Sequence, residues 1–229
     1  MKNLNIVVIG TGMYVSGRGT DGFGTILPSI VEWKRAGNSI GRVVLVGTNG
    51  LHSQETSKKA SELFLQTGVK LDLEVLPKNS EKDYDAYKEV IKNIPKPACA
   101  IIVVPDHLHY SVAKECIKAK LNILIVKPLT PTIQEGRELI ELASKNNIYG
   151  AVEFHKRWDE ANLMIKDAIN NEELGDLLYL WVEYSQRKSI PTEVFKEWAE
   201  KTSILQYLGV HYIDTVSYTH LTLPTNREV

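Results

Sequence analysis

Near its start the chain reads Asn5-Ile6-Val7-Val8-Ile9-Gly10-Thr11-Gly12, an apolar run that ends in two closely spaced glycines. A continuous apolar run of this kind is typical of a parallel strand buried on both faces of a sheet. Glycines directly behind such a strand permit a tight turn and let the backbone come close to a pyrophosphate. The sequence here predicts the first strand and the glycine loop of a dinucleotide-binding α/β fold.

Strand-like runs and helix-like segments alternate through the first two thirds of the chain. Further strands are expected at 42–46, 98–104, 122–126 and 149–154, and a one-sided strand at 69–75. Helical spacing of apolar residues predicts helices around 26–31, 84–91, 112–117 and 139–143. The last of these helices can begin at Thr130-Pro131 or at a capping box of Thr132 and Glu135. The fold class expected is therefore α/β, with an N-terminal Rossmann domain, a doubly wound parallel sheet, over residues 1–153.

The pattern changes after Phe154. A helix is expected at 159–171, a turn at Gly175-Asp176 and a long strand rich in aromatic residues at 177–184. We interpret residues 154–215 as the start of a second domain.

Composition narrows the class of protein. The 229 residues carry a net charge of −1, without the clustered lysines and arginines that nucleic acids or anionic membranes require, so neither is an expected partner. The two cysteines, Cys99 and Cys116, read as buried thiols in a reducing compartment. The first apolar run is too short for a signal peptide or a membrane span, and a cytoplasmic location is expected.

The glycine loop departs from the usual fingerprint, because Val15 stands where a third glycine is expected and the loop continues to Gly24. Arg18 in this loop either reaches a phosphate or is merely solvated. The candidate cofactor-binding residues of the loop are Gly10, Thr11, Gly12, Met13 and Tyr14.

The second strand ends in Thr48 and Asn49, two further candidates for cofactor binding. An acid at this point usually reads the ribose of NAD, and none is present. Threonine and asparagine do not repel a 2'-phosphate, so the cofactor is NAD or NADP.

Lys127-Pro128 follows the apolar run 122–126 directly. Open α/β sheets bind their ligands at the carboxyl ends of the strands, so this position favours a functional ammonium group over a simple strand-end lysine.

Taken together, Gly10-Thr11-Gly12, Val104-Pro105 with His109, Lys127-Pro128 and the segment 209–214 resemble the Gfo/Idh/MocA oxidoreductases, a family named for glucose-fructose oxidoreductase and inositol dehydrogenase. The resemblance extends over residues 1–215. It implies an NAD(P)-dependent dehydrogenase that acts on a CH-OH group and moves a hydride between a nicotinamide cofactor and a sugar, polyol or sugar derivative. For residues 154–215 it implies a partial α+β open-sheet domain, incomplete here, that serves substrate binding and oligomerisation. It also implies a homo-oligomer for the full-length protein.

The resemblance assigns roles to single residues. Lys127 corresponds to the lysine of the family's Glu-Lys-Pro motif, whose glutamate is replaced here by Val126, and His211 corresponds to the family's histidine near the substrate. Tyr207 replaces the usual aspartate four residues before that histidine. The expected catalytic residues are Lys127, His211 and Tyr207, and Pro105, His109 and Lys127 are expected beside the cofactor.

Other readings of these residues stay open. His211 can be a satisfied core histidine, and Arg157 and Trp158 either face the substrate or belong to a solvated helix start. His107 is expected to face solvent, and no third ligand accompanies the pair His107 and His109, so no metal is expected.

The end of the chain is foreign to the family pattern. Residues 216–229 are interpreted as a non-native tail on a C-terminally truncated chain, which leaves the activity of this shorter chain open. The competing hypothesis is a non-catalytic protein on the same fold that senses a dinucleotide or a sugar.

Overall fold

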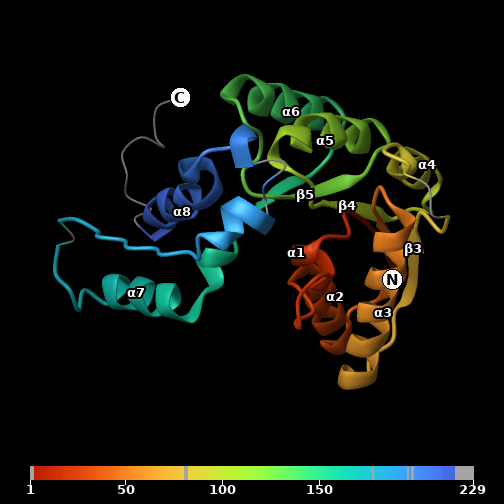
Figure 1. Cartoon of the computed structure of the whole chain (residues 1–229). Helices are drawn as coiled ribbons and strands as arrows, with labels where there is room; N and C mark the ends of the chain where they lie inside the picture. Colours follow the sequence, from red (N-terminus) through yellow and green to blue (C-terminus); the bar gives the residue numbers. More distant parts are fainter. Residues whose placement is uncertain (1–2, 80–81, 177, 195, 197–198, 220–229) are drawn as a thin grey trace. The chain divides into compact units, whose positions relative to one another are not determined.

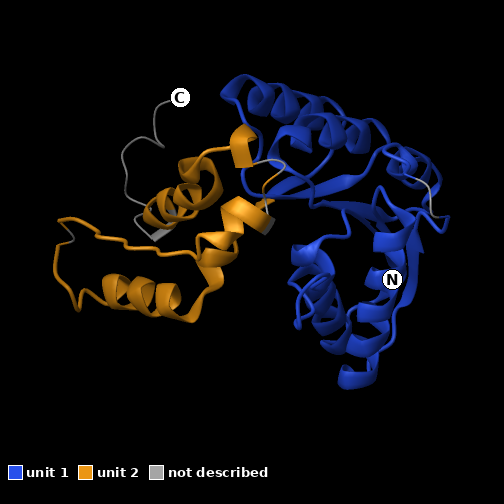
Figure 2. Cartoon of the chain, viewed as in Figure 1, with its two compact units in different colours: residues 1–151 blue, residues 152–229 orange. Residues whose placement is uncertain are grey.

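The computed structural model describes residues 3–79, 82–176, 178–194, 196 and 199–219. The chain divides into two compact units, residues 1–151 and 152–229 (Figure 2). The sequence places this boundary between residues 153 and 154.

The first unit is built on a parallel six-stranded sheet with the order β3-β2-β1-β4-β5-β6. The strands are β1 (Leu4–Ile9), β2 (Ile40–Val46), β3 (Asp72–Leu76), β4 (Ala98–Ile102), β5 (Asn122–Val126) and β6 (Gly150–Glu153). The helices are α1 (Met13–Ser16), α2 (Ile26–Arg35), α3 (Gly50–Thr67), α4 (Ala86–Asn93), α5 (His109–Lys118) and α6 (Ile133–Lys145). This doubly wound arrangement confirms the predicted fold class.

Helices cover both faces of the sheet (Figure 1). Successive residues of β1 point to opposite faces, so Val7 and Ile9 join the core under α4, α5 and α6. Ile6 and Val8 join the core under α1, α2 and α3. The last four residues of β1 are buried, which explains why the strand reads as a continuous apolar run.

Several local predictions are confirmed. The one-sided strand is β3, which lies at the edge of the sheet and has Val75 as its one buried residue. Thr132 caps the start of helix α6: its hydroxyl accepts the Glu135 backbone N–H at 3.3 Å and donates to the Glu135 carboxylate at 3.0 Å. The capping-box alternative is therefore the correct one.

Helix α3 is absent from the sequence-based prediction although it has eighteen residues. Its buried positions are Gly50, Ser53, Thr56, Ala60 and Leu63, so the face against the sheet is small and polar and carries little apolar periodicity. Its ends hold the missed signals: Asn49 caps the start, and Gly68 ends the helix with φ of +68°.

The prediction of an uninterrupted loop from Gly12 to Gly24 is wrong. Residues Met13–Ser16 form the single turn α1, which ends at Gly17 with φ of +71°. One turn is too short to show helical spacing in a sequence.

The second unit contains α7 (Glu160–Asn170) and α8 (Val210–Thr219). Short 3₁₀ and π turns occupy His155–Trp158, Ile190–Val194, Ala199–Lys201 and Leu205–Gly209; a further 3₁₀ turn, Asp106–Leu108, precedes α5 in the first unit. The predicted helix at 159–171 is confirmed by α7.

The predicted strand at 177–184 is wrong over its described part. Residues 178–184 form no strand, because no described segment pairs with them and a strand requires a hydrogen-bonded neighbour. Their apolar side chains stay exposed, and Leu178, Tyr179 and Trp181 are more than three-quarters exposed.

Of the tail expected at 216–229, residues 216–219 belong to the last turns of α8, and 220–229 lie outside the described residues. In the described part of the chain, every helix is too short or too polar to cross a lipid bilayer.

Candidate functional site

The two glycines of the first loop have different physical roles. Gly10 has φ of +123°, and a Cβ there would lie 2.1 Å from the Val103 carbonyl oxygen at the end of β4. A Cβ on Gly12 would meet nothing within 4 Å. Gly10 is therefore needed for the close approach of the strand ends, whereas Gly12 leaves open space where a ligand can approach the backbone.

Thr11, between these glycines, is buried, and two side chains donate hydrogen bonds to its backbone. Its carbonyl oxygen accepts a hydrogen bond from Arg18 Nε at 3.1 Å and another from the Thr56 hydroxyl at 3.2 Å. Arg18 also faces Glu55 at 3.6 Å. The long loop thus folds back on the glycine turn, and Met13 and Tyr14, the other two candidates of the loop, lie in α1 directly behind it.

Polar and basic groups gather at the carboxyl end of β2. Thr48 is exposed, and the Asn49 side-chain oxygen accepts the Leu51 backbone N–H at 2.9 Å, which caps α3. Lys82 pairs with Asn49 in an isolated antiparallel bridge. Partial burial lowers the pKa of His52; the Arg18 and Lys82 charges act in the same direction, while Glu55 opposes them.

Lys127 lies directly after β5, at the carboxyl ends of the strands, where the glycine loop also follows β1. Its side chain is half-buried, and the Lys127-Pro128 peptide is cis. Pro105 follows β4, the strand between β1 and β5. The structure therefore brings Gly10, Gly12, Pro105 and Lys127 to the ends of three adjacent strands.

The strand order reverses between β1 and β4, so these carboxyl ends include the reversal point of the sheet. A doubly wound sheet opens a crevice outside its strand ends at such a point, and ligands bind there. Thr48 and Asn49 lie at the end of the next strand, β2, on the other side of β1.

His109, expected beside the cofactor, is fully buried at the start of α5. Its Nδ1 lies 2.7 Å from the Pro128 carbonyl oxygen and its Nε2 lies 2.9 Å from the Val104 carbonyl oxygen. The contact with Pro128 joins positions nineteen residues apart that become neighbours through the pairing of β4 and β5, so no local pattern predicts it. His107 is exposed, as predicted.

In the second unit, His211 is buried in the first turn of α8. The ring of His155 packs against it, with ring centroids 4.5 Å apart. The Nδ1 atom of His155 lies 3.1 Å from a carboxylate oxygen of Glu153. Phe154 lies edge-on to His211, at a centroid distance of 6.2 Å. His155, a neighbour of His211, and Glu153, a neighbour of His155, are not among the site residues predicted from the sequence.

Arg157 is engaged within the second unit. Its Nε and Nη2 donate to the two carboxylate oxygens of Asp214 at 2.7 and 2.6 Å, which joins the turn His155–Trp158 to α8. Trp158 beside it is 69% exposed. Tyr207 lies in the π turn Leu205–Gly209 that leads directly into α8.

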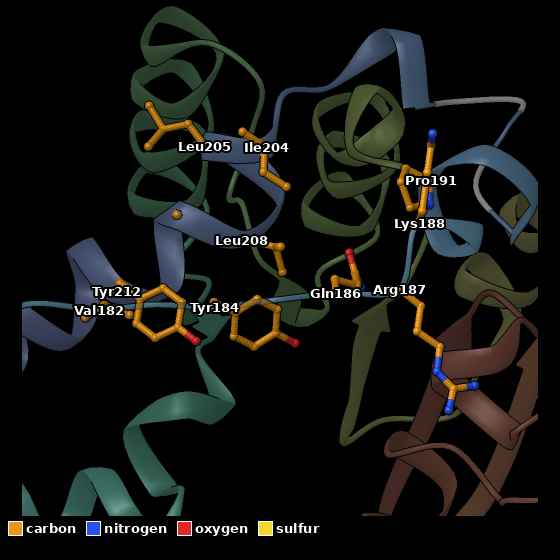
Figure 3. Close-up of a pocket in the computed structure, with 11 residues that line it drawn as sticks. Val182, Tyr184, Gln186, Arg187, Lys188, Pro191, Ile204, Leu205, Leu208 and Tyr212 are labelled. Carbon is orange, nitrogen blue, oxygen red and sulfur yellow. The ribbon is translucent and has the colours of Figure 1, made fainter.

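A cavity of about 520 Å³ lies within the second unit (Figure 3). Apolar side chains dominate one part of its lining, and the rings of Tyr184 and Tyr212 lie 5.9 Å apart between centroids. Gln186, Arg187 and Lys188 supply its polar part. The cavity could not be predicted from the sequence. Most of its lining lies in loops and turns, which have no periodic pattern.

Within the described residues, no group of three or more histidine, cysteine or carboxylate side chains is arranged to hold a metal ion. Lys127 belongs to the first unit and His211 to the second. Their convergence on one reactive carbon remains a prediction, as do the individual roles of the site residues.

Part of this chain matches a known protein family. Residues 42–154 match the model of the Gfo/Idh/MocA oxidoreductase family, described as an oxidoreductase family with an NAD-binding Rossmann fold. This Rossmann unit belongs to the Gfo/Idh/MocA family. The predicted family and the cofactor class, a nicotinamide dinucleotide, are thereby confirmed.

One curated relative of this Gfo/Idh/MocA unit is a scyllo-inositol 2-dehydrogenase (NADP(+)) of Bacillus subtilis. It is 34% identical over 130 residues, which cover 55% of this chain and 36% of the relative. The matches span about a third of the length of the first curated relatives.

Two solved structures share the fold. A myo-inositol 2-dehydrogenase from Lactobacillus plantarum is 19% identical with a TM-score of 0.66, covering 95% of this chain and 56% of its own. A levoglucosan dehydrogenase, in complex with NADH and levoglucosan, is 20% identical with a TM-score of 0.67, covering 95% of this chain and 54% of its own.

Proposed function

We propose that the protein is an NAD(P)-dependent oxidoreductase that transfers a hydride between a nicotinamide cofactor and the alcohol or ketone group of a sugar, polyol or sugar derivative. The observation that carries the proposal is the placement of Lys127 and the Gly10-Thr11-Gly12 loop at the carboxyl ends of β5 and β1, the two strands on either side of β4, in a unit of this family. The inositol and levoglucosan dehydrogenases among the similar proteins support the substrate class.

The residues of the first unit fit a dinucleotide. Open space in front of Gly12 admits a pyrophosphate to the backbone, and the close packing of Gly10 on Val103 keeps the loop near the strand end. In this proposal, Thr48 and Asn49, at the end of β2, contact the adenosine ribose. When bound, the nicotinamide ring supplies the hydride acceptor or donor.

In this proposal, Lys127 and His211 both act on the reacting oxygen of the substrate. Oxidation of an alcohol removes the hydroxyl proton as the hydride leaves the carbon, so a base must lie beside the oxygen. His211 accepts this proton, and the Lys127 ammonium stabilises the negative charge that develops on the oxygen. Tyr207 is assigned a hydrogen bond to the substrate or to the imidazole.

The test is an absorbance assay for reduced nicotinamide with NAD or NADP and a panel of inositols, hexoses and anhydrosugars. Wild type is expected to turn over at least one substrate. Lys127→Ala is expected to lose turnover while it retains cofactor binding, measured by fluorescence titration. Lys145→Ala, on the exposed face of α6, is the matched control and is expected to behave as wild type.

Cofactor binding without turnover of any substrate in the wild type would favour the alternative, a protein that senses a dinucleotide or a sugar. Tyr207, in place of an acidic residue before His211, is the feature that favours this second function. Retained turnover in Lys127→Ala would contradict the assigned role of the lysine.

We further propose that NADP is preferred over NAD. The end of β2 carries no acid that would repel a 2'-phosphate, and Arg18 and Lys82 place positive charge beside His52 and Asn49. The name of the scyllo-inositol relative, which specifies NADP(+), supports the same preference.

Asn49→Asp tests this preference. Aspartate caps a helix as well as asparagine does, so α3 is expected to keep its stability while the new carboxylate repels a 2'-phosphate. The affinity for NADP is expected to fall about tenfold or more relative to that for NAD. An unchanged ratio of the two dissociation constants would contradict the preference.

A further inference from the structure

The imidazole of His109 joins two turns that are distant in sequence. It has no solvent exposure, and its two nitrogens face the carbonyl oxygens of Pro128 and Val104 at 2.7 and 2.9 Å. Val104 lies just beyond β4, and Pro128 lies just beyond β5. One buried ring therefore contacts the backbone of both strand ends.

The same connection continues to the glycine loop. The backbone N–H of Val103 donates to the Ile9 carbonyl at 2.8 Å, and Gly10 packs so closely on the Val103 carbonyl that no Cβ fits between them. A continuous series of contacts thus runs from Gly10 through the β4 end and His109 to Pro128. Lys127 is the residue bonded directly to Pro128.

The chemistry of these contacts makes the ring hard to replace. A carbonyl oxygen only accepts hydrogen bonds, so each contact needs an N–H on the imidazole. A ring with one proton can donate to one of the two carbonyls, and a ring with two protons can donate to both. Because the ring is fully buried, water cannot take over a lost bond, and an unsatisfied carbonyl would favour movement of its turn.

We propose that His109 is a positioning residue for Lys127: its Nδ1–H donates to the Pro128 carbonyl and fixes the turn that carries the lysine relative to the glycine loop. The functional part of this inference rests on the proposed function, in which Lys127 acts on the substrate. His109 itself acts through the backbone, from behind the strand ends. The place beside the cofactor that the resemblance implies for His109 stays a prediction.

A matched pair of variants separates the two contacts. An asparagine side chain places its amide N–H near the position of Nδ1, whereas a glutamine reaches the position of Nε2. His109→Asn is therefore expected to retain the bond to Pro128, and His109→Gln to retain only the bond to Val104. Cooperative thermal unfolding and near-UV circular dichroism show that each variant is folded.

The first readout observes Lys127 without any substrate. Lysines of the full chain are reductively methylated with ¹³C-formaldehyde, and the Lys127 signal is assigned by its absence in Lys127→Arg. We expect His109→Asn to keep the Lys127 signal near its wild-type shift and His109→Gln to move it. A signal that is unmoved in His109→Gln, or moved equally in both variants, would overturn the proposal.

The second readout is kinetic. For a substrate found in the panel above, kcat of His109→Gln is expected to be about tenfold or more below that of His109→Asn, because a small displacement of a catalytic group is costly. The dissociation constant of the cofactor is expected to change less than twofold. Equal kcat in the two variants would also overturn the proposal.

The two readouts distinguish failure of this inference from failure of the proposed function. If wild type turns over no substrate, the oxidoreductase proposal fails, and the Lys127 signal still decides whether His109 positions the lysine. If wild type is active and the signal does not respond to His109→Gln, the inference fails and the function stands.

Discussion

At the scale of single residues, Gly10 and Gly12 show that two glycines of one motif meet different physical demands. Gly10 combines a positive φ with a neighbour that leaves no space for a Cβ. Gly12 has φ of −79° and open space around it. The motif itself carries no information on which glycine serves the fold and which serves the ligand.

Gly10→Ala is expected to destabilise the protein by at least about 1–3 kcal/mol, because backbone strain at positive φ adds to the clash with Val103. Gly12→Ala is expected to change the free energy of unfolding by less than about 0.5 kcal/mol and to weaken dinucleotide binding. Urea unfolding and cofactor titration measure the two effects. Equal stability of the two variants would contradict this division of roles.

The cysteines give a second residue-scale prediction. Burial raises the pKa of Cys99 to about 11 and that of Cys116 to about 12, against an ordinary value of 9. Since only the thiolate is nucleophilic, both thiols are expected to react at pH 8 about 100-fold or more slowly than an exposed cysteine. A disulfide-exchange reagent added to native and urea-unfolded protein checks this; rapid labelling of the native chain would contradict it.

At the scale of elements, the edge strand β3 is joined to β2 by a charged pair. Glu74 on β3 contacts Arg42 on β2 and forms a 2.6 Å ion pair with Lys78. The hydrogen bond from Lys78, followed by that from Arg42, lowers the pKa of Glu74 despite its partial burial. The folded state therefore binds the Glu74 proton less tightly than the unfolded state does.

This lowered pKa predicts a pH dependence with a definite sign. The stabilisation by Glu74 is fully present above its unfolded pKa of about 4.5 and is lost as the pH falls through its folded pKa. Glu74→Gln is expected to cost under about 1 kcal/mol at pH 7, because the partners are partly exposed. The difference between variant and wild type in urea unfolding should shrink below pH 4.5; a constant difference would contradict the prediction.

At the scale of the whole molecule, the two units differ in how much apolar surface they bury. Both core clusters lie entirely within the first unit. In the described part of the second unit, only His211 and Thr215 are buried, and no apolar side chain is. Hydrophobic burial, the main source of folding stability, is thus concentrated in residues 1–151.

We therefore expect residues 1–151, expressed alone, to unfold in one cooperative transition and to bind the dinucleotide. Residues 152–229 alone are expected to show no cooperative transition, because little apolar area leaves water on folding. Differential scanning calorimetry of both pieces measures this. A sharp transition in the second piece, or none in the first, would contradict the expectation.

The local sequence was sufficient to predict much of the Rossmann unit, because its central strands are buried on both faces and read as apolar runs. The β1 run is an example. The one-sided β3 and the Thr132 cap of α6 were also predictable, because alternation and capping are local patterns. Prediction failed at α3, whose buried face is small and polar, and at 178–184, where β-favouring residues have no strand to pair with among the described segments. Strand formation depends on a partner that composition cannot supply.

The sequence by itself determined the family, the glycine loop and the place of Lys127 behind a buried strand, because each follows from residues adjacent along the chain. Only the tertiary structure decided that Gly10 packs on Val103, that Arg18 returns to Thr11, and that His109 contacts the carbonyls of both Val104 and Pro128. The contacts of Gly10 with Val103 and of His109 with Pro128 join residues brought together by the parallel pairing of β1, β4 and β5. Their geometry is a property of the sheet, and no short stretch of the chain contains it.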